Sequence, residues 1–433
     1  MTTIPSSTDV LIVGGGPAGT LLAVLLARRG IDVLVVEKQS TLERDVRSET
    51  IAAASVALLR DLGFAPALRR HGFLETTGIS VRMEGRRVFH VDYGRFAVGV
   101  LPIDIPQPAL TGILHEEAGQ LPGYHRALST TLTGLVEQGG VIRGGILRRE
   151  DGERVEVRAR LVVGADGRFS KVRQEAGLAT DVHPVERDLL SFELPRPAGW
   201  GSDAQLVLNR GRHVFVLPAF PDLLRVGHTV PRHALGAVRG AGPEAFRAGV
   251  AAVDPRLAPL LGTHPRTWDD TAVLEVFTAD AREWSRDGLI LIGDASHTST
   301  PVLGQGVNLA IQDTVLLAPV IARGLAAGGG PLPERLFRDF VFSRRLHKQA
   351  VARYQQLQEE ALAQYGPGRV RLRRARLRVL NALPLKYRLL DRVVNFRHPV
   401  DPADLRADRP CAAVAAVPEC EAPLGRLPVR SRR

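Results

Sequence analysis

A glycine-rich turn between a short hydrophobic strand and a helix constrains the fold of this 433-residue chain more than any other feature. Residues 9–13 read Asp-Val-Leu-Ile-Val, which is typical of a buried parallel strand, and a helical pattern of leucines follows the turn. Between them, Gly14, Gly16 and Gly19 match the pattern G-x-G-x-x-G. The first glycine permits a tight turn, the second lets backbone approach a pyrophosphate, and the third allows close helix packing. With a second hydrophobic run at 31–36, this pattern predicts a strand–helix–strand unit that binds a dinucleotide.

The acidic residue Glu37 ends that second run, about 20 residues beyond the glycines, where a carboxylate can accept both ribose hydroxyls of an adenosine. A carboxylate there would repel a 2′-phosphate, so the bound nucleotide is expected to be FAD or NAD and not NADP. The alternative is an exposed glutamate at a strand end. The expected nucleotide-binding residues of this unit are Gly14, Gly16, Pro17, Ala18, Gly19, Glu37 and Lys38.

Two later segments distinguish FAD from NAD. Residues 161–170 read Leu-Val-Val-Gly-Ala-Asp-Gly-Arg-Phe-Ser, and residues 288–313 hold a hydrophobic strand, a Gly-Asp pair and the turn Pro-Val-Leu-Gly-Gln-Gly. With the glycine-rich turn, they resemble the motifs of the class A flavoprotein monooxygenases, the aromatic hydroxylases of the para-hydroxybenzoate hydroxylase fold. The resemblance covers about residues 8–360, with the three motifs in the family's order.

The resemblance implies roles for individual residues. Asp166 would lie near the pyrophosphate, and Asp294 would bond a hydroxyl of the FAD ribityl chain, although Asp294 as a helix N-cap without a ligand is the alternative. Reduced flavin carries negative charge, which a glycine-rich helix start can stabilise. The remaining residues expected to contact FAD are Arg47, Gln107, Gly304, Gly306, Val307 and Asn308. Pro301 is the expected catalytic position and would act through its backbone and shape, whereas a structural role explains His297 at least as well.

The function that the resemblance implies is FAD-dependent monooxygenation. NADPH or NADH would deliver hydride to FAD, O₂ would add at flavin C4a, and the hydroperoxide would transfer one oxygen atom to a small, electron-rich aromatic or enolic substrate. A base or hydrogen-bond partner near the ring is then expected, with His213, His228 and Tyr93 as candidates. Apolar residues of the expected substrate domain, with Arg212 and Arg225 nearby, suggest a bulky phenol of the polyketide type, and the alternative is that they are core residues. These apolar residues are Phe192, Leu206, Leu208, Phe215, Leu217 and Phe220.

The expected fold class is α/β: a Rossmann-like FAD-binding domain with an inserted antiparallel-sheet substrate domain and a helical C-terminal extension. The FAD-binding domain would comprise residues 1–184, including inserted strands at about 79–92, and would resume at 286–363. Residues 185–285 would form the substrate domain. Residues 364–433 would form a basic helical extension that is partly disordered.

Charge is distributed unevenly. Residues 366–433 carry a net charge of +10 of the chain's +11, so the body is nearly neutral and nucleic-acid binding is not expected. The basic amphipathic stretch 366–395 is interpreted as a solvated face or subunit contact, or as a peripheral contact with an anionic membrane. We expect no transmembrane segment and no signal peptide. With two cysteines, this indicates a cytoplasmic protein, whose oligomeric state the sequence leaves open.

Two functions other than aromatic hydroxylation are also consistent with these residues. Metal sites and hydrolase triads have no supporting motif, so no metal is expected. One alternative is another flavoenzyme of the same fold, such as a membrane-surface polyprenyl-phenol hydroxylase, an epoxidase or a prenyl reductase. The other is a flavin-bound interaction protein without catalysis.

Overall fold

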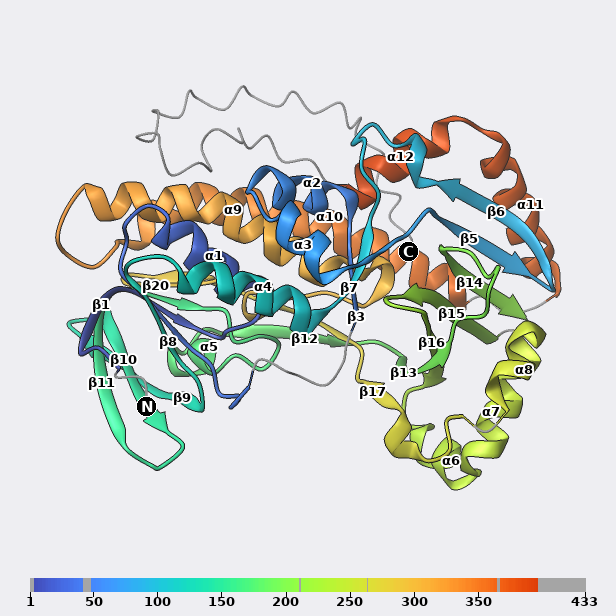
Figure 1. The fold of residues 1–433 in the computed structure, drawn as a ribbon, viewed down its shortest axis with the longest axis horizontal. Helices are drawn as coiled ribbons and strands as arrows, with labels where there is room; N and C mark the ends of the chain where they lie inside the picture. The colour runs from blue at the N-terminus through green and yellow to red at the C-terminus, as the bar shows by residue number, and fades with distance from the viewer. Residues whose placement is uncertain (1–3, 42–47, 210–211, 263, 364–366, 396–433) are drawn as a thin grey trace, which may run out of the picture.

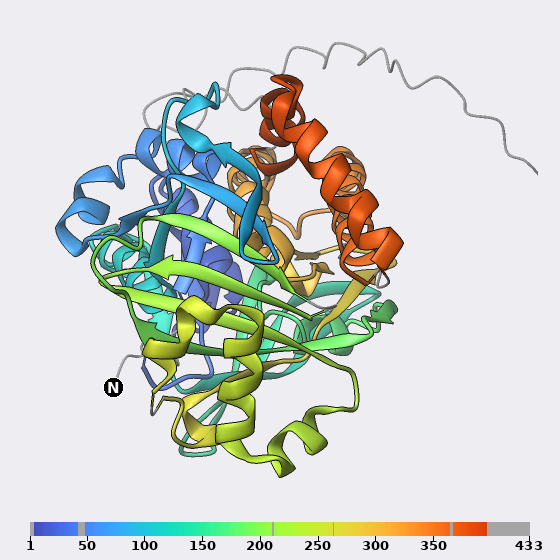
Figure 2. The same ribbon diagram turned by 90° about the vertical axis from the view of Figure 1, so that its right-hand side faces the viewer.

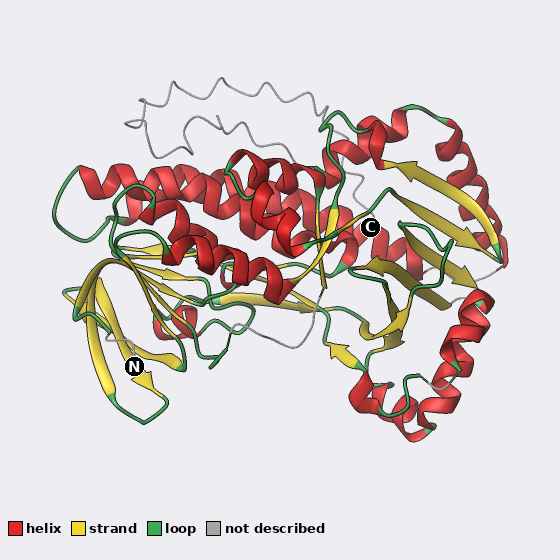
Figure 3. Cartoon of the chain, viewed as in Figure 1, coloured by secondary structure: helices red, strands yellow, loops and turns green. Residues whose placement is uncertain are grey.

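The computed structural model describes residues 4–41, 48–209, 212–262, 264–363 and 367–395. In this part of the chain, two large β-sheets lie side by side, and helices cover both of them (Figures 1 and 3). The expected α/β class is therefore confirmed, with a Rossmann-like unit, a second sheet and a helical C-terminal region.

The first sheet has eight strands within the described residues. Parallel pairing joins β20 to β11, β11 to β1, β1 to β2 and β2 to β8, as expected for the dinucleotide-binding unit. Strands β9 and β10 extend β11 in an antiparallel meander, and β19 pairs with β20. The strands are β1 (Ser7–Val13), β2 (Val33–Val36), β8 (Tyr124–Ala127), β9 (Thr130–Gln138), β10 (Val141–Arg149), β11 (Arg154–Gly164), β19 (Ser285–Arg286) and β20 (Leu289–Leu291).

Both faces of this sheet are buried, which explains the unbroken hydrophobic runs of β1 and β2. Val10 and Ile12 of β1 pack in one core with the helices, whereas Leu11 and Val13 point to the opposite core under the meander. The helices of the first core include α1 (Pro17–Ala27), α4 (Gln107–Gly119) and α9 (Gln305–Ala326).

Helix α9 is the one described helix that is long and apolar enough to cross a membrane by length and composition. In the fold, 61% of its apolar window is buried between α1 and the rest of the first core. That position is typical of a central core helix. After the 3₁₀ turn η6 (Glu334–Phe337), the long helix α10 (Arg338–Ala363) runs beside it (Figure 1).

The second sheet has seven strands in the order β17-β13-β16-β15-β14-β5-β6 within the described residues. Its strands are β5 (Gly78–Met83), β6 (Arg86–Asp92), β13 (Arg187–Pro195), β14 (Asp203–Asn209), β15 (Arg212–Ala219), β16 (Leu223–Pro231) and β17 (Ala272–Leu274). One face packs on the helices α6 (Leu235–Gly240), α7 (Gly242–Val253) and α8 (Ala258–Leu261).

Two features of this sheet differ from the expectation. The sequence predicts that the hairpin at 79–92 belongs to the FAD-binding domain. Its first strand, β5, instead pairs in parallel with β14, so the hairpin belongs to the second sheet. Most of the stretch 235–261 is helical, whereas the sequence predicts an antiparallel sheet for the whole segment 185–285. The sequence does not show which strand β5 pairs with, because strand pairing joins residues far apart in the chain. The helix, in contrast, could have been predicted, because Phe246, Val250 and Val253 recur at helical spacing. Residues 277–281 and Ser285, also expected in the substrate domain, pair outside this sheet. We propose the other domain boundaries as the sequence predicts them.

Smaller elements connect the two sheets. One small sheet has the order β3-β7-β4, from β3 (Ser48–Ile51), β4 (Leu74–Glu75) and β7 (Ile103–Pro106). Another has the order β12-β18-β21, from β12 (Thr180–Pro184), β18 (Phe277–Ala281) and β21 (His297–Thr298). The remaining helices of this part are α2 (Ala53–Asp61), α3 (Ala65–His71) and α5 (Lys171–Glu175).

The basic extension forms two helices, α11 (Pro367–Ala382) and α12 (Leu385–Val394), which lie along β5 and β6 (Figures 1 and 2). Leu377, Leu380 and Leu390 pack there on the outer core of the second sheet. The expectation of disorder at the C-terminal end concerns residues that, from 396 onward, lie outside the described part of the chain.

Candidate active site

A cavity of about 1390 Å³ connects the two sheets. At one end it is lined by Val13, Val36, Ala165 and Ile292, which end or directly follow the parallel strands β1, β2, β11 and β20. At the other end it is lined by strands β13, β15 and β16 of the second sheet. Ligands of open α/β sheets bind outside the carboxyl ends of the strands, so the first end is the expected nucleotide site.

The glycine-rich turn lies at this first end. Gly14 has φ +109°, and a side chain there would collide with the carbonyl oxygen of Ala165. A side chain on Gly19 would collide with the carbonyl oxygen of Gly14, so this glycine serves helix packing and does not line the cavity. Gly16, Pro17 and Ala18 line it at the N-terminus of α1, where unpaired N–H groups and the helix dipole favour an anion.

Glu37 closes the turn from the side of β2. Its Oε2 accepts a hydrogen bond of 2.8 Å from the Gly15 N–H, and its Oε1 accepts one of 3.1 Å from the Gln39 N–H. The side chain lines the cavity although the residue is only 4% exposed, and Lys38 lines the cavity beside it from an exposed position. These bonds fix the carboxylate at the edge of the nucleotide site.

Asp166 follows β11 and combines two positions. It lines the cavity, and its carboxylate caps α5 by accepting hydrogen bonds from the Ser170 hydroxyl at 2.5 Å and from the Lys171 and Val172 N–H groups at 2.6 and 3.0 Å. Burial raises the pKa of Asp166 against the opposing effect of these bonds. Asp166 therefore organises the loop around the cavity as well as bordering it.

Asp294 lies where β20 passes into the 3₁₀ turn η4 (Gly293–Ala295). Burial raises the pKa of its carboxyl group, opposed chiefly by the nearby charges of Arg168 and Lys348. Its side chain lines the cavity, and no hydrogen bond to the carboxylate is present among the described residues. A half-buried carboxylate that borders a cavity and has no hydrogen-bond partner among the described residues is suited to accept a hydrogen bond from a ligand hydroxyl.

The loop after Asp294 leads into α9. Pro301 lines the cavity from an exposed position, Gly304 adopts the left-handed conformation with φ +58° as the N-cap of α9, and Gly306 and Val307 line the cavity in the first turn. Asn308 does not line it. Its side chain instead donates to the Thr50 and Gly304 carbonyls and accepts from the Ala52 N–H at 2.8 Å, which ties β3 to the helix start.

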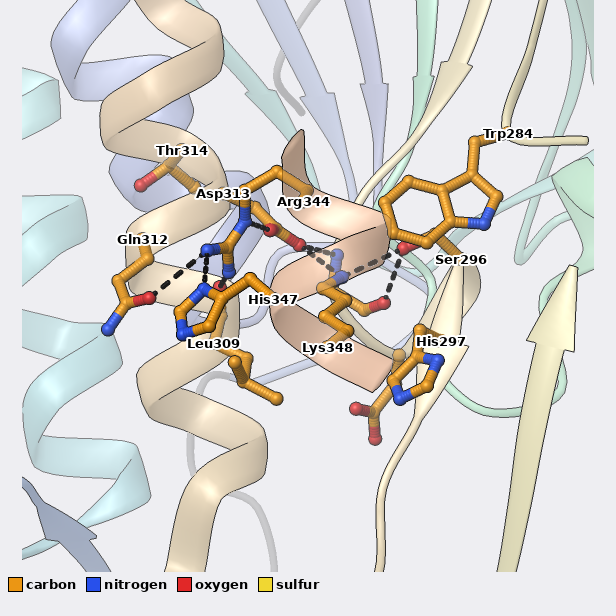
Figure 4. A network of polar contacts seen from close by, with 12 residues as sticks. Trp284, Ser296, His297, Leu309, Gln312, Asp313, Thr314, Arg344, His347 and Lys348 are labelled. Atoms are coloured by element: carbon orange, nitrogen blue, oxygen red, sulfur yellow. Dashed lines mark hydrogen bonds and ion pairs between the residues drawn. The ribbon is translucent and has the colours of Figure 1, made fainter. Parts of the chain in front are cut away.

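A buried ionic network supports this loop from behind (Figure 4). Asp313 of α9 forms ion pairs of 2.7 Å with both Arg344 and Lys348 of α10, and all three side chains are at most 1% exposed. The same carboxylate accepts the Gly293 N–H at 2.9 Å, and Lys348 also donates to the Ser296 hydroxyl at 3.1 Å. The network joins α9, α10 and the loop that carries Asp294.

Helix α10 contacts the cavity walls at two further points. The Gln355 side chain donates hydrogen bonds to the carbonyl oxygens of Thr300 and Val302 at 3.1 and 2.8 Å, on either side of Pro301. Near the end of the helix, Glu359 forms an ion pair of 2.6 Å with Arg187 of the second sheet, and both residues line the cavity. One helix therefore contacts the nucleotide loop and the second sheet.

The second end of the cavity is formed by one face of the antiparallel sheet. Leu189, Phe215 and Leu217 give it apolar surface, and Glu193 and Arg225 give it charge. The opposite face of the same strands packs on α7 as core. Of the six apolar residues that the sequence suggests for this site, Phe192, Phe215 and Leu217 line the cavity, whereas Leu206, Leu208 and Phe220 do not.

The three candidate bases occupy different positions. His228 packs edge-on against Phe246 and does not line the cavity. His213 is buried next to the cavity face with its ring 2.9 Å from the Thr229 hydroxyl, and burial lowers the pKa of His213 to about 3. Tyr93 lines the cavity, and burial raises the pKa of its hydroxyl well above the usual value. Neither histidine is therefore placed to act on a ligand.

Most of the residues expected to bind a cofactor border this one cavity. Those that do so are Gly14, Gly16, Pro17, Ala18, Glu37, Lys38, Gln107, Asp166, Asp294, Gly304, Gly306 and Val307. Gly19 and Asn308 lie behind it, and Arg47 lies outside the described residues. Further lining residues that the sequence did not reveal include Thr50, Thr130 and Ser299. No motif marks them, because their position depends on how loops converge in the fold.

Within the described residues, no group of His, Cys, Asp and Glu side chains is placed to hold a metal ion.

Comparisons with known proteins identify relatives of this chain in sequence and in fold. Residues 7–353 match the model of the FAD binding domain family. The chain is 35% identical over 366 residues to a 6-methylpretetramide 4-monooxygenase from Streptomyces rimosus, covering 83% of this chain and 85% of the relative. It is 25% identical over 338 residues to a digeranylgeranylglycerophospholipid reductase from Methanosarcina mazei, covering 74% of this chain and 76% of the relative. The crystal structure of p-nitrophenol 4-monooxygenase PnpA from Pseudomonas putida superposes with a TM-score of 0.76 at 20% identity, covering 94% of this chain and all of PnpA.

Proposed function

Since the chain belongs to the FAD binding domain family, we propose that it is an FAD-dependent monooxygenase that hydroxylates an electron-rich aromatic or enolic compound. The observation that carries the proposal is the single cavity that joins a dinucleotide-binding turn to an apolar sheet face.

The residues at the first end fit FAD by their chemistry. The N-terminus of α1 would bind the pyrophosphate, and the Glu37 carboxylate would accept the ribose hydroxyls of the adenosine. The Asp294 carboxylate, half-buried and without a hydrogen-bond partner among the described residues, would accept a hydrogen bond from a hydroxyl of the ribityl chain. Gly304, Gly306 and Val307 would border the flavin ring. Arg47, Gln107 and Asp166 remain expected contacts of the same group, and Asn308 would act from behind the cavity by holding the start of α9.

When bound, FAD supplies the redox chemistry: NAD(P)H and O₂ are consumed, one oxygen atom enters the substrate and the other leaves as water. The protein contributes electrostatics and position. The start of α9 presents N–H groups and its positive dipole end where negative charge develops. The Pro301 turn, held by Gln355 from α10, fixes where the substrate ring meets the cofactor. NADPH or NADH as the donor, O₂ as co-substrate and a cytoplasmic location, where these nucleotides are supplied, belong to the proposal.

The substrate that we propose is a polyketide-type phenol or enol. The relative from Streptomyces rimosus is named as a monooxygenase of 6-methylpretetramide, and it matches over most of both chains. The apolar residues Leu189, Phe215 and Leu217 would cover the faces of a polycyclic ring system.

The test is a turnover assay on the purified full-length chain loaded with FAD. A panel of phenols and polyphenols, with 6-methylpretetramide included, is offered with NADPH or NADH under ¹⁸O₂. We expect one class of compound to accelerate nicotinamide oxidation and to gain a single ¹⁸O atom in the mass spectrum. A protein that retains no FAD, or that retains FAD but transfers no oxygen to any member, would overturn the proposal.

A second candidate is a flavoenzyme that acts on lipids at a membrane surface. It is favoured by the outer face of α11 and α12, where Leu372, Val379, Leu385 and Leu389 are about half exposed or more among arginines. The reductase from Methanosarcina mazei is named for a lipid substrate. Sedimentation with anionic vesicles, but not with zwitterionic ones, would support this candidate over the first.

A further inference from the structure

The sheet face at the second end of the cavity carries one pair of opposite charges that the proposed function does not yet use. Glu193 of β13 is the direct cross-strand neighbour of Arg225 on β16, and Arg225 in turn faces Leu217 on β15. All three residues line the cavity. The two charges therefore lie side by side on the surface that faces a substrate.

Arg225 is held in place by a fully buried acid. Asp104 of β7 is 0% exposed, and its Oδ2 lies 3.5 Å from the Arg225 guanidinium. Its Oδ1 accepts the Phe220 N–H at 3.0 Å, so the Asp104 carboxylate is itself fixed. The Arg225 side chain is 20% exposed, which leaves part of the guanidinium at the cavity. A guanidinium has five donors, more than one carboxylate can engage.

Glu193 differs from its neighbour in having no such anchor. Among the described residues, no hydrogen bond or ion pair within 4 Å engages its carboxylate, although the residue is half-buried. Burial raises the pKa of Glu193, and the charge of Arg225 opposes that shift. A half-buried acid that borders a cavity without a protein partner is available to a ligand.

The surface around the pair suits a flat ring. Ser191, Gly227 and Phe215 form the next cross-strand row on this face of the sheet. Gly227 lies two residues after Arg225 on β16 and therefore on the same face. A Cβ on Gly227 would come within 3.0 Å of the Leu189 side chain, so the glycine lets Leu189 lie close against the sheet face at this point. Leu189, Leu217 and Phe215 then border the charged pair with apolar surface.

We propose that Glu193 and Arg225 form a substrate subsite that recognises two neighbouring oxygen atoms on the rim of a polycyclic phenol or enol. Arg225 donates hydrogen bonds to a carbonyl or ionised hydroxyl oxygen, and Glu193 accepts a hydrogen bond from the adjacent hydroxyl. The subsite rests on the proposed function and adds the substrate feature that it selects: a donor next to an acceptor, as in a hydroxyl beside a quinone carbonyl. Such a site rejects analogues that lack the hydroxyl hydrogen, because the buried carboxylate is then left unpaired.

The test uses the full-length protein loaded with FAD and two probes, 1,8-dihydroxyanthraquinone and its 1,8-dimethoxy analogue. Binding is followed by the change in flavin absorbance as each probe is added. We expect the wild type to prefer the dihydroxy probe by at least ~10-fold, the size of one hydrogen bond to a charged group. Glu193→Gln and Glu193→Ala should each lose most of that preference. Arg225→Lys keeps the charge beside Asp104 and should weaken binding of both probes, because the carbonyl is common to them.

The matched control is Asp222→Asn, which removes an acid three residues before Arg225 whose side chain is 81% exposed. It should retain the preference of the wild type. Equal affinity for the two probes in the wild type, no binding of either, or an unchanged preference in Glu193→Ala would overturn the subsite. In each of these cases a normal flavin spectrum and oxygen transfer to any phenol would leave the proposed function standing, whereas failure to retain FAD would remove the proposed function.

Discussion

The Asp294 carboxyl lies half-buried at the edge of the cavity, where desolvation opposes its ionisation. Its pKa in the folded protein without FAD is raised above the ordinary value of about 4. Below that ordinary value the group is protonated in both states and its ionisation costs the fold nothing. As the pH rises from there through the raised pKa, ionisation becomes progressively less favourable in the folded state than in the unfolded state.

We therefore expect Asp294→Asn to stabilise the FAD-free protein at neutral pH while weakening FAD binding. The difference in unfolding free energy between variant and wild type should be near zero below pH 4 and should grow towards pH 7. FAD affinity should fall ~10-fold or more, since a hydrogen bond to a charged group is lost. Urea unfolding across this pH range and FAD titration check the two effects. A variant that is less stable than the wild type at pH 7 would contradict this view of Asp294.

At the scale of elements, the ionic network between α9 and α10 is the most demanding contact. Removing one partner of a buried ion pair leaves an uncompensated charge and costs about 3–5 kcal/mol. Because Arg344 still pairs with Asp313 after Lys348→Met, we expect this substitution to lower the unfolding free energy by less, about 1–3 kcal/mol. It should also weaken FAD binding, because Asp313 accepts the Gly293 N–H next to Asp294.

The control on the same helix is Arg353→Met, at an exposed position, which should change the unfolding free energy by less than about 0.5 kcal/mol. Thermal unfolding and FAD titration of both variants give the comparison. Equal effects of the two substitutions would show that the network does not support the nucleotide loop.

The elements show how far a sequence can be interpreted. The strand–turn–helix around Gly14 was predictable because its signals are local, in a strand, a turn and a helix start that adjoin in the chain. The partners of strands β5 and β6 were not, because pairing with β14 joins residues more than 100 positions apart. The network at Asp313 was not predictable either, since nothing in the spacing of residues 313, 344 and 348 distinguishes buried charges from the exposed charges that are usual on a helix.

At the scale of the whole molecule, the basic extension is part of the fold. Helices α11 and α12 cover Val88, Phe89 and Val91 of β6, and Lys386 donates to the His90 carbonyl at 2.8 Å. Deleting residues 367–433 should therefore expose apolar surface at the second sheet, lower its unfolding temperature and increase binding of an apolar dye such as ANS. Because the residues around Gly14 and Asp294 lie on the first sheet and α9, the truncated protein should still bind FAD, although it loses the hydrogen bond from the Ala54 N–H to the Asn395 side chain. Unchanged thermal unfolding would indicate that the extension is only appended.

Helix α10 fixes the dimensions of the cavity. Lys348, Gln355 and Glu359 contact the ionic network, the Pro301 turn and the second sheet in that order, and a helix rises 1.5 Å per residue. The stretch of α10 from Lys348 to Glu359 thus sets a separation of about 16 Å between the nucleotide loop and the second sheet. A residue inserted between 348 and 359 would rotate one set of contacts by about 100° relative to the other. Related proteins that accept larger or smaller substrates should therefore differ in the side chains of the second sheet and keep the length of α10.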